Sequence, residues 1–331
     1  MLTDEHEKLV LPRKGTIDWA GFRREDFTAE QLDAAADAWR TRALQEFHSL
    51  ALFTQLSSQL HLLGAPLDWS GAFARMIVDE VRHTDVCMKM CEALGRPSSP
   101  SIVESDLHLV SERSLRERVR DVVLAAFCIG ETISGRMFKG ALRAATVPLA
   151  RDVVAAILVD ETFHGELGWE LGALLMREIE PSERAYVVER LPVLFAHYAE
   201  LCSAKPGLAW ARSQPIAQPA PNFGTLTAAG YARAFFEGMD EDVVPGLVAI
   251  GLPEAESAWR AVMTRCRSGL DRRETARTRR ARPGVPLRGG QRASWSTTRR
   301  QIPVASSAKI RVSFAFWFRS TMRAGGDGSR A

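Results

Sequence analysis

The sequence DEVRH occupies residues 79–83 and DETFH occupies residues 160–164, so the pattern D-E-x-x-H occurs twice in the chain. In an α-helix, residues three positions apart lie on one face, so each glutamate and its histidine can point to a common spot. Helix-bundle proteins that bind two metal ions take such a pair from each of two helices and one further glutamate from each of two others. The repeated motif therefore predicts an all-α fold and two additional glutamate ligands.

Two glutamates in apolar surroundings are the candidates. Glu46 has Ala43, Leu50 and Phe53 on the same side of a predicted helix. Glu131 interrupts the most apolar stretch of the chain, where an unpaired carboxylate would be costly to bury. The predicted metal ligands are Glu46, Glu80, His83, Glu131, Glu161 and His164. Four carboxylates and two imidazoles without sulfur suit two iron ions, with manganese or a mixed manganese–iron pair as the alternative.

Each motif also begins with an aspartate. Asp79 stands four residues before His83, and Asp160 stands four residues before His164. In metal sites, such carboxylates accept a hydrogen bond from the N–H of the imidazole nitrogen that does not bind the metal and so fix the tautomer. We expect Asp79 and Asp160 to support the histidines in this way.

Helix start and stop signals delimit the first two helices. Thr28 with Gln31 three residues later predicts an N-terminal capping box, and Gly64 predicts the end of that helix. Asp68 is the predicted N-cap of the next helix, which is expected to end at Gly95.

Two further helices are expected at about 114–145 and 149–179, joined tightly around Pro148. Residues 96–112 are rich in turn formers and predict a long connection before them. The first and second predicted helices are joined by a short turn, the second and third by a long connection, and the third and fourth by a short turn. This is the connectivity of a ferritin-like four-helix bundle with one long crossover. The predicted domains are an N-terminal segment (1–27), the four-helix bundle (28–180), accessory C-terminal helices (181–270) and an Arg-rich tail (271–331). The accessory helices are expected at 181–203, 226–239 and 253–268, with a proline-rich linker at 205–222.

The charge is distributed unevenly along the chain. Residues 271–331 hold 15 Lys+Arg and 3 acidic residues, a net +12, which leaves 28 against 37, a net −9, for residues 1–270. We expect the tail to be disordered, or to come from a shifted reading frame. Nucleic-acid binding through this basic tail is the less favoured interpretation.

The N-terminal sequence and the cysteines predict a cytoplasmic protein. Residues 1–10 are acidic where a secretory signal would be basic, and the apolar run at 122–130 is too short to cross a bilayer. The five cysteines are odd in number and form no C-x-x-C pair, so they are expected to be reduced thiols. They are Cys87, Cys91, Cys128, Cys202 and Cys266.

The chain resembles a known family over residues 40–178. Its segments EFHSLALF, LGAP, DEVRHTDVC, GET and DETFHGELGW resemble bacterial ferritin-like domain proteins, and the two motifs are similar to the metal motifs of di-iron oxidases and bacterial multicomponent monooxygenases. The resemblance implies oxygen chemistry at a reduced di-iron centre. It also implies that Glu80 and Glu161 bridge the ions, that Glu46 and Glu131 are terminal ligands, and that His83 and His164 bind separate ions.

These patterns predict an O2-dependent di-iron oxidoreductase acting on a small organic substrate. The alternative is a rubrerythrin- or ferritin-like protein that handles iron or scavenges peroxide, and a metal-free helical interaction module is a third. An external electron donor and a homodimer are compatible with the first hypothesis. A ribonucleotide-reductase role is not expected, because none of the three tyrosines, Tyr186, Tyr198 and Tyr231, lies in the four predicted bundle helices.

Overall fold

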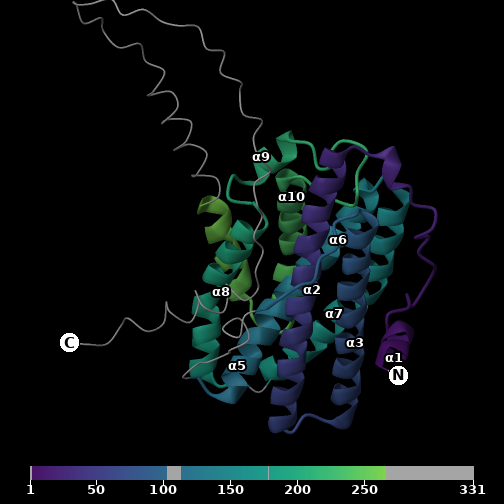
Figure 1. The fold of residues 1–331 in the computed structure, drawn as a ribbon. Coiled ribbons are helices and arrows are strands. Elements are labelled where there is room, and N and C mark those ends of the chain that lie inside the picture. The colour runs from purple at the N-terminus through teal and green to yellow at the C-terminus, as the bar shows by residue number, and fades with distance from the viewer. Residues whose placement is uncertain (1, 103–112, 178, 266–331) are drawn as a thin grey trace, which may run out of the picture.

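The structure, a computed structural model, describes residues 2–102, 113–177 and 179–265. These residues form helices and no strand, which confirms the predicted all-α fold (Figure 1). The elements are α1 (Leu2–Leu9), η1 (Arg24–Asp26), α2 (Ala29–Leu62), α3 (Leu67–Ala93), α5 (Leu115–Val122), η2 (Val123–Glu131), α6 (Thr132–Ala144), α7 (Pro148–Arg177), α8 (Pro181–Leu201), α9 (Leu208–Ser213), α10 (Ala228–Gly238), η3 (Met239–Val243), α11 (Val244–Ala249) and a last helix at 254–265. None of the described helices is both long and apolar enough to cross a bilayer. The predicted tail at 271–331 and Cys266 lie outside the described residues.

The first long helix, α2, begins and ends where the sequence predicted. The backbone N–H of Gln31 donates to the Thr28 hydroxyl at 3.3 Å, and the backbone N–H of Thr28 donates to the Gln31 side chain at 2.9 Å. This capping box satisfies backbone donors that the helix itself leaves unpaired. Gly64, with φ at +77°, follows the last turn in the left-handed region that glycine adopts readily.

The second long helix, α3, begins differently from the prediction. Its N-cap is Pro66, which makes no side-chain capping bond, so the expected N-cap role of Asp68 is wrong. Asp68 lies inside the first turn, where its carboxylate accepts the N–H of Trp69 at 3.0 Å. An acidic group in the first turn still interacts favourably with the helix dipole.

The third long helix is interrupted by a π-helix. Its middle, η2, consists of nine residues whose hydrogen bonds are wider than those of the predicted continuous α-helix. This segment packs closely on α7, where a β-carbon at Gly168 would lie 2.7 Å from that of Phe127. A β-carbon at Gly172 would lie 2.7 Å from the sulfur of Cys128. The two glycines of α7 therefore allow the apolar π-helix to approach.

The accessory helices extend beyond their predicted bounds. Helix α8 begins at Pro181 as expected, but α9 forms inside the predicted linker at 205–222. Helix α10, η3 and α11 run on from Ala228 to Ala249, where a helix at 226–239 was predicted. The helical conformation continues beyond residue 239 because Val243 and Leu247 are fully buried.

Two hydrophobic cores lie at opposite ends of the four long helical stretches, and a polar layer separates them. On α2, Ala43 belongs to one core and Phe53 to the other, and Glu46 lies between them. On α7, Ile157 and Leu167 flank the second motif in the same way. Helices α2, α3 and α7 thus pass from one core to the other at the position of a predicted ligand, whereas the third stretch does so beyond Glu131, between Ile133 and Phe138.

Candidate metal centre

The structure brings all six predicted ligands together in the polar layer. All six are buried, with at most 7% of the residue exposed, and they come from α2, α3, the end of η2 and α7. Their side chains form two groups that could hold a metal ion, and within each group the ligand atoms lie within 4.8 Å of one another. The first group is Glu46, Glu80, His83 and Glu161, and the second is Glu131, Glu161 and His164.

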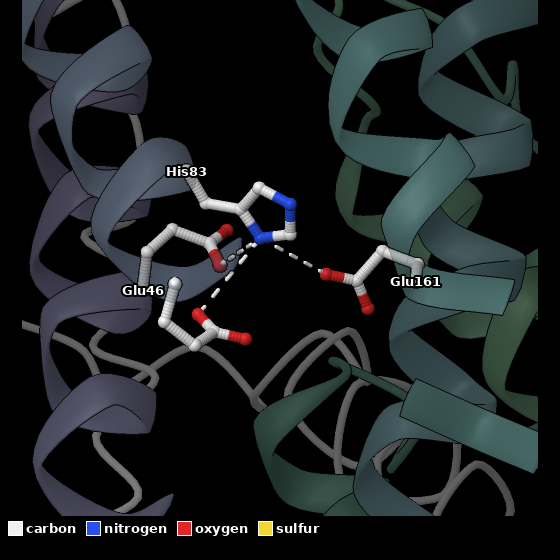
Figure 2. Close-up of side chains that lie close together, drawn as sticks. Glu46, His83 and Glu161 are labelled. Atoms are coloured by element: carbon white, nitrogen blue, oxygen red, sulfur yellow. Dashed lines mark ion pairs between the residues drawn. The ribbon is translucent and has the colours of Figure 1, made fainter. Parts of the chain in front are cut away.

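In the first group, three carboxylates surround one imidazole nitrogen. Nδ1 of His83 lies 3.6 Å from Oε2 of Glu46, 3.5 Å from Oε1 of Glu161 and 3.9 Å from Oε2 of Glu80. Figure 2 shows the His83 ring between Glu46 on one side and Glu161 on the other. The carboxylates converge on the ring from three different helices.

A matching arrangement surrounds His164, where Glu80 of the first group joins Glu131 and Glu161. Its Nδ1 lies 3.3 Å from Oε1 of Glu80, 3.9 Å from Oε2 of Glu131 and 4.0 Å from Oε1 of Glu161. Glu80 and Glu161 thus face both imidazoles, whose ring centroids are 5.7 Å apart. Glu46 lies beside His83, and Glu131 lies beside His164.

Burial and mutual repulsion disfavour the ionised carboxylates. Desolvation raises the pKa of Glu80 and Glu161 well above the ordinary value, and the neighbouring carboxylates raise it further. Desolvation raises the pKa of Glu131 as well. For His83, burial alone would lower the pKa, but the adjacent carboxylates of Asp160 and Glu46 outweigh burial and raise it to about 9. The metal-free cluster therefore retains protons at neutral pH.

Several ligand atoms have no hydrogen-bond partner among the described residues. They are Oε2 of Glu80, Oε2 of Glu161 and Nδ1 of both His83 and His164. Buried polar atoms are normally satisfied, so four such atoms facing one another call for an explanation. A cation bound among them would satisfy the oxygen and nitrogen atoms together.

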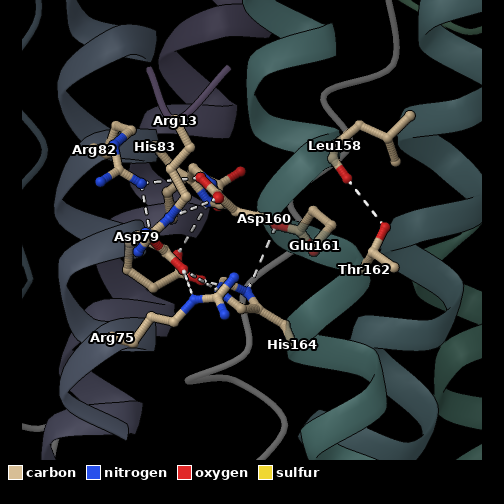
Figure 3. Close-up of polar contacts among 12 residues, drawn as sticks. Arg13, Arg75, Asp79, Arg82, His83, Leu158, Asp160, Glu161, Thr162 and His164 are labelled. Atoms are coloured by element: carbon tan, nitrogen blue, oxygen red, sulfur yellow. Dashed lines mark hydrogen bonds and ion pairs between the residues drawn. The ribbon is translucent and has the colours of Figure 1, made fainter. Parts of the chain in front are cut away.

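Each aspartate lies against the histidine of the other helix, and Asp160 is within hydrogen-bonding distance of His83. Oδ2 of Asp160 lies 3.4 Å from Nε2 of His83, and Oδ2 of Asp79 lies 3.5 Å from Nε2 of His164 (Figure 3). The prediction paired each aspartate with the histidine of its own motif, and that pairing is wrong. Side chains of an α-helix project outward from its axis, so Asp79 and Asp160 can reach across to the ring on the facing helix.

Arginines bind the outer side of this aspartate pair. Nη1 of Arg82 lies 2.7 Å from Oδ1 of Asp79 and 3.0 Å from Oδ2 of Asp160. Nη2 of Arg13 lies 2.6 Å from Oδ1 of Asp79, and its Nε lies 3.0 Å from Oδ1 of Asp160. Although burial opposes it, hydrogen bonding with His164, Arg13 and Arg82 lowers the pKa of Asp79.

Sequence reasoning missed both arginines. Arg82 stands inside the first motif, so its position one residue before a ligand was an available signal. Arg13 lies 66 residues before Asp79, and no local pattern links the two.

The described cysteines and His61 are not among the candidate ligands. The four described cysteines are buried and free, as predicted. Cys87 belongs to a hydrophobic core. His61 bonds to the Ser57 carbonyl and the Ser70 hydroxyl, each at 2.7 Å, between α2 and α3.

No family model, no curated protein and no solved structure matches the chain. The candidate site therefore rests on its own geometry and chemistry.

Proposed function

We propose that this chain is a non-haem di-iron oxidoreductase of the ferritin-like type, which uses O2 to oxidise a small organic substrate. The observation that carries the proposal is the buried cluster of four carboxylates and two imidazoles with unpartnered ligand atoms. A metal-free core would gain nothing from so many buried acidic groups, which cost stability unless a cation neutralises them.

Each half of the cluster would hold one ion. Glu46 with His83 would hold the first, Glu131 with His164 the second, and Glu80 and Glu161, which face both imidazoles, would lie between the two. A pair of reduced iron ions, when bound, supplies electrons for chemistry with O2. Manganese or a mixed pair remains the alternative for the same donor set.

The protein's own residues exclude water from one side and present apolar groups on another. The aspartates and arginines occupy the Nε2 side of both histidines. Aromatic rings lie beside His164, where the Phe53 centroid is 6.0 Å from the imidazole and 4.7 Å from that of Phe127. We place an apolar part of the substrate on this aromatic side.

An iron-handling or peroxide-scavenging role is the alternative function. The oxidoreductase is favoured because α8, α10 and η3 pack over the side of the molecule that carries η2 and α6, an elaboration that iron handling does not require. A cytoplasmic location is proposed with it, in keeping with the free buried cysteines.

Anaerobic reconstitution with ferrous iron, followed by exposure to O2, tests the proposal. We expect about two bound irons per chain and a burst of O2 consumption that ends once this iron is oxidised. Glu131→Gln should lose at least one iron, whereas Glu166→Gln, on the exposed side of α7, should keep both. Fewer than about two irons in the wild type, or an unchanged Glu131→Gln variant, would refute the site. Continued uptake of many irons per chain would support the iron-handling alternative.

A further inference from the structure

The two D-E-x-x-H motifs are not equivalent at their fourth residue. The first has Arg82 there, and this guanidinium contacts both Asp79 and Asp160. The second has Phe163 at the same place, one residue before His164. Helix α7 therefore contributes no arginine to match the one from α3.

A different segment supplies the second guanidinium. Arg13, which follows α1, reaches over α3 and contacts the same two aspartates as Arg82 (Figure 3). Its Nε also donates to Oδ1 of Asp79 at 2.9 Å. Arg75 stacks on the Phe163 ring, with its guanidinium carbon 3.6 Å from the ring centroid, and lies 3.7 Å from Oδ2 of Asp79.

The N-terminal segment is attached to α3 next to these contacts. The carbonyl of Leu9 accepts a hydrogen bond from Nη2 of Arg82 at 3.1 Å. His6 lies 3.3 Å from Asp85, and Val10 is buried. These contacts place Arg13 so that its side chain, 34% exposed, covers two aspartates whose side chains are fully buried.

We propose that Arg13 is a positioning residue of the metal centre, which holds Asp79 and Asp160 against the histidines of the facing helices. This inference rests on the proposed function. With both carboxylates fixed, each imidazole keeps its Nε2 side toward an aspartate, at 3.4 Å in the His83–Asp160 pair and 3.5 Å in the His164–Asp79 pair, and presents its Nδ1 to the carboxylate cluster. Two adjacent buried carboxylates also repel each other. Arg82 and Arg13 contact both of them, whereas Arg75 lies 3.7 Å from Asp79 alone.

Anaerobic titration with Co(II), followed by its visible absorption, tests Arg13 without relying on activity. Arg13→Met keeps the length of the side chain but removes its charge and hydrogen bonds. We expect it to weaken Co(II) binding by about 10- to 100-fold and to change the absorption bands, because both histidines lose their fixed orientation. Arg13→Lys should recover part of the affinity. The matched control is Lys14→Ala, at the neighbouring exposed position, which should bind Co(II) like the wild type.

The outcomes separate this inference from the proposed function. If the wild type binds two Co(II) ions and Arg13→Met binds them with unchanged affinity and spectrum, Arg13 has no positioning role and the metal site stands. If Arg13→Lys is as weak as Arg13→Met, the loss comes from packing of the N-terminal segment, and the inference is overturned. A wild type that binds no Co(II) would overturn the proposed function and this inference with it.

Discussion

Glu131 illustrates the cost of the cluster at the level of one residue. Its carboxyl is buried at the end of an apolar π-helix, and desolvation raises its pKa. We expect Glu131→Gln to stabilise the metal-free protein by about 1 kcal/mol, because functional sites commonly sacrifice stability of this order. Chemical denaturation of the metal-free variant and wild type measures the difference. A destabilised variant would show that Glu131 has a structural role instead.

The metal-free protein should lose stability as the pH rises. The raised pKa values of Glu80 and Glu161 mean that their stabilising contribution is complete below about pH 4.5 and declines as each group ionises. His83 contributes in the same direction, since its pKa is raised from 6.5 to about 9. Asp79 and Asp160 have lowered pKa values and act oppositely, so stability also falls in strong acid. Thermal unfolding from pH 4 to 10 should show this decline above mildly acidic pH, and an unchanged midpoint across pH 5–9 would contradict it.

The residues of the site differ in how far the sequence predicts them. Glu80 and His83 share one helical turn, so their spacing is sufficient to predict a common direction. Glu46 and Glu131 were predicted because each interrupts an apolar face. The partner of Asp160 depends on which side chain of the facing helix approaches it, and sequence spacing within one helix contains no such information.

At the level of elements, helix α8 supports the π-helix η2. The Tyr198 hydroxyl donates to the Ala125 carbonyl at 2.7 Å, and both groups are buried. We expect Tyr198→Phe to destabilise the protein by about 1 to 2 kcal/mol, because it leaves a buried carbonyl without this donor. Urea unfolding measures the loss, and Tyr231→Phe, on the partly exposed side of α10, is the matched control. Equal unfolding midpoints for Tyr198→Phe and the wild type would contradict this role.

The same elements show why helix positions are easier to predict than helix type. Thr28 with Gln31 and Gly64 are local signals, and they located both ends of α2. The π-helix at Val123–Glu131 has no comparable signal, because its apolar residues suit an α-helix equally well. Tyr198 comes from outside the four long helical stretches, so its contact with η2 depends on tertiary packing.

At the level of the whole molecule, the polar layer divides the interior into two hydrophobic cores. Within this layer, the ligands and the aspartate–arginine contacts connect the long helices, together with Arg75 of α3, which stacks on Phe163 of α7. We expect amide hydrogen exchange in the metal-free protein to show two protected regions with different opening free energies. Metal loading should bring these free energies together, and identical exchange patterns with and without metal would contradict the expectation.

The layer also has a consequence for how the chain matures. Two cores can condense separately during synthesis, each with its own half of every long helix, and leave the acidic plane between them as the last region to settle. Metal binding would then complete the folding of this last region. A chain without metal would hold its native helices but remain looser across the middle, and cellular proteases could distinguish it from the loaded form.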